Sequence, residues 1–190
     1  MIYLASQSPR RRELLSQIGV SYELVQTDID EIPLAGESPI EYVVRMAKEK
    51  ALSAASQYQD KPLLAADTTV VCENNILGKP RDRSHYLEMM HCLSGNTHEV
   101  ITAIAITRGS DPSSLATASS SSEVRFRNLQ ETEIEAYWQT GEPSDKAGGY
   151  AIQGLAAAFV SEIRGSYSGI MGLPLFETAE LLKKFAVNVI

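Results

Sequence analysis

The chain contains 190 residues, of which 44% are hydrophobic and 22% are charged. This composition is typical of a globular protein and excludes a disordered or fibrous chain. The 24 acidic residues outnumber the 17 lysines and arginines, so the formal net charge is −7. We therefore expect neither a nucleic acid polymer nor an anionic membrane as partner, because both bind a net basic surface. A small anion is still a candidate ligand, since charges beyond about 8 Å are screened from a local basic pocket.

Targeting signals and cysteine content point to one compartment. No apolar run approaches the roughly 18 residues that a membrane-spanning helix needs. The first residues lack the charged and then apolar order of a secretory signal, so we expect a cytoplasmic protein. Cys72 and Cys92 are too few for a disulfide framework or a metal cluster, and we expect both thiols to be reduced.

Apolar runs and helical patterns alternate in the first half of the chain, which predicts an α/β fold. Both helices in this half begin with Ser-Pro, in which the serine suits the N-cap and the proline suits the first helical position. The expected strands are 2–5 and 63–72, and the expected helices are 9–18 and 39–57.

The second half continues the alternation after a turn at 73–75. The run 100–107 is apolar on both faces and predicts a central strand, whereas 109–122 is rich in Ser, Gly and Pro and predicts a surface excursion or long hairpin loop. The remaining expected elements are a helix from Asp82 to before Gly95, an edge strand at 123–127, a helix carrying Ile134, Tyr137 and Trp138, a glycine-rich loop at 145–154, a strand at 159–163 and a helix at 174–185.

A basic helix start follows the first strand, where Ser6-Gln7-Ser8-Pro9 leads into Arg10, Arg11 and Arg12. A helix N-terminus carries about half a positive charge, so three arginines there oppose the helix dipole. A bound anion would reverse that effect, because the free N–H groups and the arginines would both donate to it. The motif indicates a phosphate site, and the alternative is a solvated basic patch.

One lysine lies on the apolar side of the second helix. At about 100° per residue, Lys50 falls among Val43, Met46, Ala47 and Ala54. Polar residues of this helix, Arg45, Lys48 and Glu49, fall on the opposite side, which we assign to solvent. Lys50 either points into a cleft to meet an anion or extends its ammonium along the surface to water.

A single charge interrupts the apolar strand at 63–72. Aspartate is depleted in strands and is rarely buried without a partner, so Asp67 is a candidate catalytic base or metal ligand, with a structural ion pair to an arginine as the alternative. We place it at a strand end or a bulge. Thr68 would face the other side of a regular strand, so both can serve one site only if the backbone is irregular or Thr68 acts through its main chain.

Taken together, these residues resemble the Maf family of nucleoside triphosphate pyrophosphatases. The matching stretches follow the family's order over nearly the whole chain and include Leu-Ala-Ser-Gln-Ser-Pro-Arg-Arg at 4–11 and Ala-Asp-Thr-Thr-Val at 66–70. Gln7 and Gly169 are mild departures from the family pattern. The other matching stretches are 42–51, 78–82, 93–98, 145–154 and 172–175.

The resemblance implies a fold and an activity. The fold is a two-lobed α/β structure in which helices flank an elongated mixed sheet with a central cleft, similar to inosine triphosphatase, and residues 1–190 form one domain whose two lobes surround that cleft. The activity is hydrolysis of a nucleoside triphosphate to the monophosphate and pyrophosphate, with a divalent metal, Mg²⁺ or alternatively Mn²⁺. The protein is then expected to be a cytoplasmic homodimer.

Individual residues also acquire roles from the resemblance. Asp67 aligns with the catalytic proton acceptor, and Glu31, Lys50 and Lys79 align with catalytic residues of the cleft; Glu31 and Asp67 are the candidate metal ligands. The dTTP/UTP subgroup carries Arg, Thr and Gln at its selectivity positions, as this chain does. The expected substrate-binding residues are Ser8, Arg10, Arg11, Thr68 and Gln153.

Two functions follow. The first is a pyrophosphatase for dTTP and UTP that removes non-standard nucleotides, with modified uridine or cytidine triphosphates left open as substrates. The alternative is a nucleotide-binding regulator of septum formation that acts by protein contact. The acid at Asp67 together with Lys50 and Lys79 favours catalysis, because binding alone requires no base.

Overall fold

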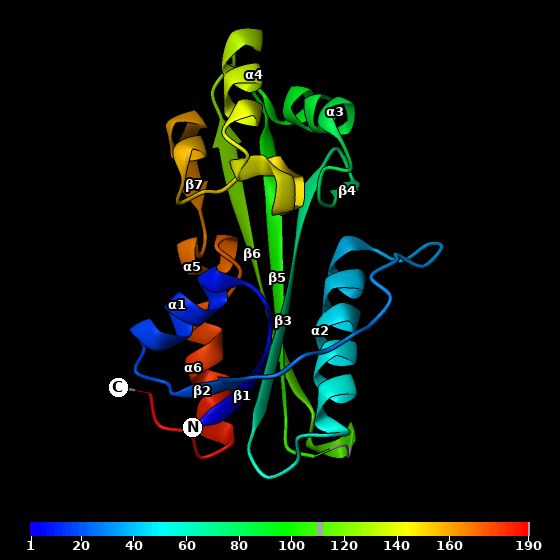
Figure 1. Cartoon of the computed structure of the whole chain (residues 1–190), viewed down its shortest axis with the longest axis vertical. Helices are drawn as coiled ribbons and strands as arrows, with labels where there is room; N and C mark the ends of the chain where they lie inside the picture. Colours follow the sequence, from blue (N-terminus) through cyan, green and yellow to red (C-terminus); the bar gives the residue numbers. More distant parts are fainter. Residues whose placement is uncertain (110–111, 190) are drawn as a thin grey trace.

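Three long strands run through both ends of the molecule: β3 (Leu63–Cys72), β5 (Thr97–Thr107) and β6 (Ala116–Phe126). The computed structural model describes residues 1–109 and 112–189, and in it β5 pairs antiparallel with both β3 and β6 (Figure 1). β5 lies between two long neighbours, and its side chains pack into hydrophobic clusters on both faces of the sheet, which confirms the prediction of a central strand.

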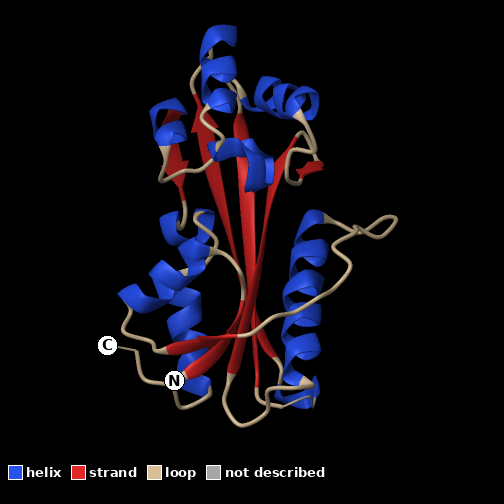
Figure 2. Ribbon diagram, in the orientation of Figure 1, coloured by secondary structure: helices blue, strands red, loops and turns tan. Residues whose placement is uncertain are grey.

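Shorter strands complete a seven-stranded mixed sheet, in the order β2-β1-β3-β5-β6-β7 with β4 also paired to β3. β1 (Ile2–Ala5) is parallel to β2 (Tyr22–Leu24) and to β3. β4 (Asn75–Leu77) and β7 (Val160–Arg164) are antiparallel to their partners. The predicted α/β class with an elongated mixed sheet is confirmed (Figure 2).

Helices cover both faces of the sheet at the end that contains the N-terminus. Alternate residues of β3 point to opposite faces, so Leu63 and Ala65 pack toward α2 (Pro39–Ala55). Leu64 and Ala66 pack on the other face, where α1 (Pro9–Gln17) and α6 (Leu175–Lys184) lie. Two separate hydrophobic clusters result, one on each face of the same strands.

A third hydrophobic cluster lies at the far ends of the long strands, under α3 (Arg83–Leu93) and α4 (Glu131–Gln139). Its buried rings include Tyr86, Phe126 and Tyr137. The short helix α5 (Tyr167–Ile170) joins this end to α6. The two-lobed fold is thus formed around shared strands. That residues 1–190 form one domain stays a prediction, which the continuity of β3, β5 and β6 supports.

Most predicted elements occur close to their expected bounds. The strands at 2–5 and 63–72 agree with β1 and β3, and the predicted turn at 73–75 contains two residues with positive φ, Glu73 and Asn74. Asp82 caps α3 by accepting a hydrogen bond from the amide of His85. None of the helices in the described residues combines the length and apolarity needed to cross a bilayer.

The predicted surface excursion at 109–122 is wrong for its second half. Residues 116–122 belong to β6, which continues without interruption into the predicted strand at 123–127 and pairs with β5 and β7, so it is not an edge strand. Serine dominates residues 116–122, and a serine-rich composition is typical of a loop. The composition did not reveal that this segment pairs with β5 as a strand. Residues 110 and 111 of the excursion lie outside the described residues.

The prediction of two reduced thiols is also wrong in the structure, where Cys72 and Cys92 form a disulfide. Cys72 ends β3 and Cys92 lies in the last turn of α3, so the bridge fastens that helix to the sheet. The two cysteines are separated by 20 residues in the sequence, and only the packing of α3 brings them together.

Replacing one cysteine tests the bridge. We expect Cys92→Ser to lower the free energy of unfolding by about 3 kcal/mol under oxidising conditions, because closing a loop of 20 residues restricts the unfolded chain. Urea unfolding followed by circular dichroism measures this difference. With excess dithiothreitol the variant and the original protein should unfold at similar urea concentrations, and identical midpoints without reductant would contradict the role of the bridge.

Candidate active site

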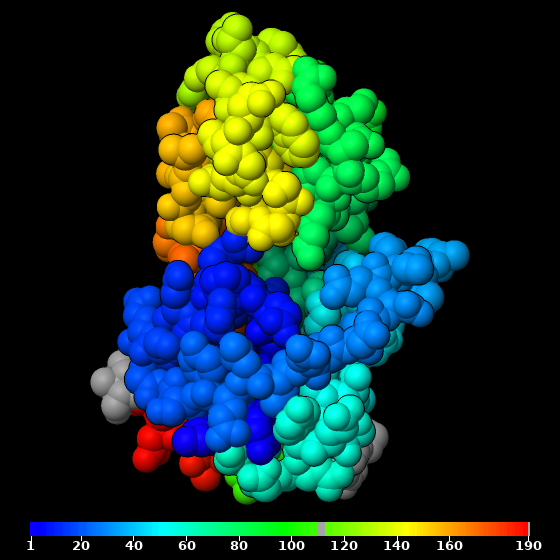
Figure 3. Space-filling model, in the orientation of Figure 1, coloured from blue at the N-terminus to red at the C-terminus, as the bar shows by residue number. Residues whose placement is uncertain are grey.

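A gap in strand pairing opens the edge of β3. β1 pairs with residues 63–65 of β3 and β4 pairs with residues 70–72. Within the described part of the chain no strand pairs with residues 66–69 on that edge. A cleft of about 550 Å³ lies at this gap. Figure 3 shows the recess, bordered by the blue β1–α1 junction, the loop before α2 and the yellow segment near residue 147.

The cleft has a local charge opposite to that of the whole chain. Although acidic residues exceed basic ones by 24 to 17 overall, more cations than carboxylates line the cleft among the described residues. They come from segments far apart in the sequence. The lining cations are Arg10, Arg11, Lys50, Lys79 and Lys146, and the lining carboxylates are Glu31, Asp67 and Asp145.

Lys50 of α2 joins two carboxylates in the cleft. Its Nζ lies 2.7 Å from Oδ1 of Asp67 and 2.6 Å from Oε1 of Glu31. Only 12% of the Lys50 side chain and 11% of the Asp67 side chain are exposed, so this ion pair is largely shielded from water. The interpretation that Lys50 points into a cleft is confirmed, whereas an ion pair between Asp67 and an arginine is not what the structure contains.

Burial and charge act in opposite directions on the two carboxylates. Burial raises the pKa of Asp67 above its usual range, although the charges of Lys50 and Arg11 partly offset this. Glu31 is more exposed, and there the burial effect is outweighed by the hydrogen bond and charge of Lys50, which lower its pKa. The less acidic carboxyl group, Asp67, is therefore the better proton acceptor.

The position of Asp67 differs from the prediction. It is in the middle of β3 in regular register, opposite Ala103 of β5, and not at a strand end or bulge. Asp67 faces α2, and Thr68 faces α1, as the alternation of a regular strand requires. Both nevertheless line one cleft, because no strand covers their edge of β3 and the cleft reaches around it to both faces.

Arg11 anchors the Thr68 side of the gap. Its Nε donates to the carbonyl of Gly172 at 2.7 Å, and its Nη2 donates to Oγ1 of Thr68 at 3.0 Å. A further bond runs from Nη1 to Oγ of Ser6 at 3.3 Å. Burial lowers the pKa of Arg11, and the charge of Asp67 partly offsets this. Arg11 lines the cleft and also connects α1, β3 and the turn before α6.

The hydrogen bonds beyond Thr68 have a fixed direction. Thr102 of β5 donates to the carbonyl of Gly169 at 2.7 Å, so its oxygen must accept from Thr68, 2.9 Å away. The Thr68 hydroxyl has then used its only proton, and the side chain can offer a ligand only an acceptor. Thr102 was missed by the sequence analysis, although a buried threonine within an apolar strand is a similar signal to that of Asp67.

The start of α1 forms one wall of the cleft. Ser8 occupies the N-cap position, but its side chain makes no capping hydrogen bond. Ser8 and Arg10 both line the cleft, with the N-terminal end of α1 between them. No acidic residue lies in the first turn, so the helix dipole favours an anion at this wall.

The opposite wall comes from the other lobe. Lys79 follows β4 and is exposed, and Lys146 forms an ion pair with its neighbour Asp145. Gly148 and Gly149 have positive φ and pack against Val70 and Tyr86, where a β-carbon would meet side-chain atoms at 3.0 Å. These glycines let the loop pack against the sheet and present Lys146 to the cleft.

The chain is also similar to known proteins. Residues 1–185 match the family described as Maf-like protein. The chain belongs to the Maf family. Among its relatives are proteins named dTTP/UTP pyrophosphatase from Alkalilimnicola ehrlichii (52% identical, covering 98% of this chain and 94% of the relative) and Saccharophagus degradans (50%, covering 99% and 90%). A third protein of the same name, from Aromatoleum aromaticum, is 52% identical, and the match covers 97% of this chain and 95% of the relative.

Solved structures with a similar arrangement include a HAM1 protein from Coxiella burnetii, with a TM-score of 0.45 and 16% identity over 66% of this chain and 72% of that chain. The Ham1 protein of Staphylococcus aureus has a TM-score of 0.44 and 11% identity over 66% and 71% of the two chains.

The three positions that the Maf resemblance links to substrate selectivity do not all line the cleft. Arg10 and Thr68 line it, whereas Gln153 is exposed and is not among the lining residues. Its neighbour Ile152 does line the cleft, so Gln153 lies at the border. The role of Gln153 in binding a base therefore stays a prediction. Gln7, one of the departures from the family pattern, does line the cleft.

Two carboxylates of the cleft have the chemistry of ligands for a divalent cation. Glu31 and Asp67 direct carboxylate oxygens to the same point, which the Lys50 ammonium contacts in this structure. Oxygen ligands are those that Mg²⁺ prefers. In the described residues no three His, Cys, Asp or Glu side chains are grouped to hold a metal, so an ion here would need further oxygens from water or a phosphate.

Replacing Arg11 tests its anchoring role. We expect Arg11→Met to lower the free energy of unfolding by about 2–4 kcal/mol, because buried acceptors on three segments lose a charged donor. Arg164→Met is the matched control, since the Arg164 side chain is 71% exposed and pairs only with Glu162 among the contacts found; it should change stability by less than about 0.5 kcal/mol. Equal effects in urea unfolding would show that Arg11 anchors nothing.

Proposed function

We propose that this Maf protein is a nucleoside triphosphate pyrophosphatase that hydrolyses dTTP and UTP to the monophosphate and pyrophosphate. The observation that carries the proposal is the buried Asp67–Lys50 pair at the edge of β3, in a cleft lined by cations from several segments. The names of the relatives, which are about half identical over nearly the full chain, support the same activity and substrates. The alternative of a septum regulator is not favoured.

The charge of the cleft suits a triphosphate. Phosphoryl transfer depends on positioning and on neutralising charge more than on covalent chemistry. In this proposal Arg10 and the start of α1 bind the β- and γ-phosphates, and Lys79 binds them from the opposite lobe. Pyrophosphate then leaves along the α1 wall, where its charge is stabilised.

Asp67 acts as the general base. Its ionised carboxylate accepts a proton from the water that attacks the α-phosphorus, and burial, by raising its pKa, strengthens it as a base. Lys50 contacts Asp67 at 2.7 Å, which keeps the carboxylate ionised and oriented before the substrate binds.

A divalent cation, Mg²⁺ or alternatively Mn²⁺, belongs to this proposal. Glu31 and Asp67 would hold it together with oxygens of the triphosphate. When bound, it would neutralise phosphate charge and polarise the phosphorus that is attacked. Glu31 is suited to this role because Lys50 lowers its pKa and keeps it ionised.

Base selection is assigned to Thr68 and Gln153. Thr68 can only accept from a ligand, and the N3–H group of uracil or thymine is a donor. Gln153 has a donor and an acceptor, which match the remaining edge of the same bases. Modified uridine or cytidine triphosphates remain open as substrates. We further propose, from the Maf resemblance, a cytoplasmic homodimer of single-domain subunits, in which reducing conditions would open the Cys72–Cys92 bridge.

Product analysis tests the activity. With Mg²⁺ present, we expect UTP and dTTP to give UMP or dTMP together with pyrophosphate, and to be preferred over ATP and GTP, as the names of the relatives indicate. Ion-exchange chromatography separates the products, and cytidine and modified uridine triphosphates complete the substrate panel. Release of inorganic phosphate alone, or a preference for purines, would refute the proposal.

Asp67 gives a pH prediction. Activity needs its ionised form, and burial raises its pKa above 3.8, so turnover should fall with decreasing pH already above the range of an ordinary aspartate. The groups that face it are Lys50, Arg11 and Glu31.

Asp67→Asn should lose about 10²–10⁴-fold in kcat while the protein stays folded by circular dichroism. Retention of full activity would remove Asp67 from the mechanism.

A further inference from the structure

Glu31 lies in a long loop that needs an anchor. The loop joins β2 to α2 over residues 25–38 without a helix or strand, and most of its side chains from 26 to 36 are exposed. Three of the exposed large apolar side chains, Ile32, Leu34 and Ile40, belong to it or to the first turn of α2. Yet the Glu31 carboxylate is within 2.6 Å of the Lys50 ammonium, so the main chain must be held near α2 by other contacts.

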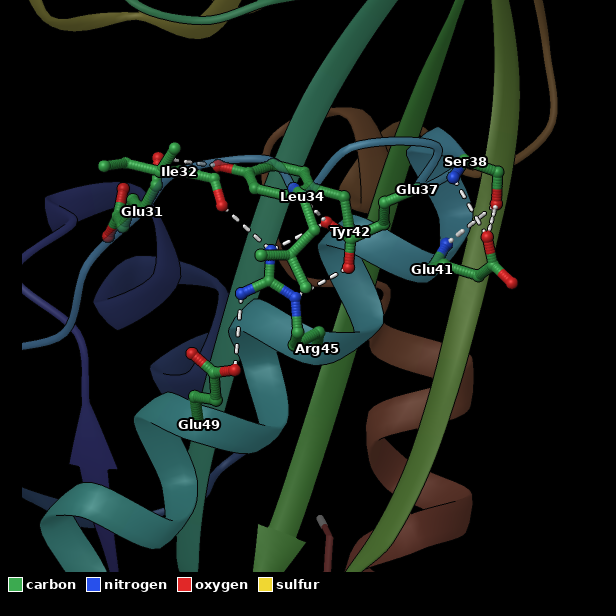
Figure 4. A network of polar contacts seen from close by, with 9 residues as sticks. All are labelled: Glu31, Ile32, Leu34, Glu37, Ser38, Glu41, Tyr42, Arg45 and Glu49. Atoms are coloured by element: carbon green, nitrogen blue, oxygen red, sulfur yellow. Dashed lines mark hydrogen bonds and ion pairs between the residues drawn. The ribbon is translucent and has the colours of Figure 1, made fainter.

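Arg45 of α2 makes most of those contacts (Figure 4). Its Nε and Nη2 donate to the two carboxylate oxygens of Glu37 at 2.6 and 2.7 Å, and Nη2 also donates to the carbonyl of Ile32 at 2.9 Å. Glu37 in turn accepts a hydrogen bond from the amide of Leu34 at 3.0 Å. One guanidinium thus fixes the chain on both sides of residues 33–36.

The same helix holds the residue next to Ile32. The hydroxyl of Tyr42 donates to the carbonyl of Glu31 at 3.3 Å, and the Arg45 guanidinium lies 5.7 Å from the centre of the Tyr42 ring. Arg45 lies on the side of α2 away from the sheet, as predicted, but the loop covers part of it and leaves its side chain 22% exposed.

Arg45 does not act on the substrate directly. It is five residues from Lys50, which places the two side chains about 140° apart around the helix, and it is not among the residues that line the cleft. Its link to the cleft runs through the main chain from Ile32 to Glu31.

We propose that Arg45 is a positioning residue, which fastens the 31–37 loop to α2 and thereby holds the Glu31 carboxylate beside Lys50, where it can serve as the proposed metal ligand. The inference rests on the proposed function for its kinetic consequences, but the anchoring itself does not depend on any activity. Partners that orient a metal ligand without touching the metal commonly change metal affinity or activity by about 10–100-fold when they are removed.

The test compares Arg45→Gln with a matched control. Arg127→Gln removes an arginine of the same kind, which binds Glu133 at 2.6 and 2.9 Å and two main-chain carbonyls in the other lobe. We expect Arg45→Gln to reduce kcat/KM for UTP by about 10–100-fold and to raise the Mg²⁺ concentration for half activity, with little change in the control. Arg45→Lys keeps the charge but not the two-pronged geometry, so it should restore only part of the activity.

A double substitution shows whether the effect passes through Glu31. In a Glu31→Gln background, Arg45→Gln should change kcat/KM less than about 3-fold, because the carboxylate that it positions is already absent. Equal losses in both backgrounds would mean that Arg45 acts by another route and would overturn the inference. Wild-type kinetics in Arg45→Gln would overturn it as well.

Hydrogen exchange provides a readout without substrate. The amide of Leu34 donates to Glu37, and the amide of Glu37 donates to the carbonyl of Leu34 at 3.1 Å, so both should exchange faster in Arg45→Gln and at the original rate in Arg127→Gln. Unchanged exchange would overturn the anchoring. If the unaltered protein hydrolyses no triphosphate, the proposed function fails, and this exchange experiment still decides the role of Arg45.

Discussion

The access of Asp67 to substrate and water depends on an incomplete sheet edge. β1 and β4 both pair with β3, but at opposite ends, and in the described part of the chain the residues between them have no strand neighbour on that edge. A charge in the middle of a strand that was covered on both edges and both faces would lack access to substrate and water. The gap gives Asp67 that access while β5 holds its backbone in regular register.

The gap also determines which side chains each lobe contributes to the cleft. β1 ends at the gap and leads into α1, so the basic helix start lies on one side. β4 lies on the other side and is followed by Lys79, while the loop with Lys146 packs beside it through two glycines. Cations from distant parts of the sequence therefore meet because both strands end at the same opening in β3. This explains how an acidic chain forms a cleft in which cations outnumber carboxylates.

Local patterns in the sequence were sufficient to predict much of this arrangement. A lysine on the apolar side of a helix and an aspartate in an apolar strand each need a partner, and each is the other's partner. The sequence could not show that Asp67 lies mid-strand, because strand-edge coverage is a property of the sheet and not of the strand. For the same reason the serine-rich part of β6 and the Cys72–Cys92 bridge were misjudged, since pairing with β5 and packing of α3 decide them.

Arg45 shows the limit of helical periodicity. The periodicity separates the side of α2 that packs on the sheet from the side that does not, but it cannot say whether a loop covers the second side. In the structure both sides of α2 act on Glu31: Lys50 holds its carboxylate, and Tyr42 and Arg45 hold its main chain or that of its neighbour. α2 itself packs on β3 and β5 through a buried hydrophobic cluster. Glu31 is therefore tied to α2 and to the strand that carries Asp67, although its own loop is largely exposed.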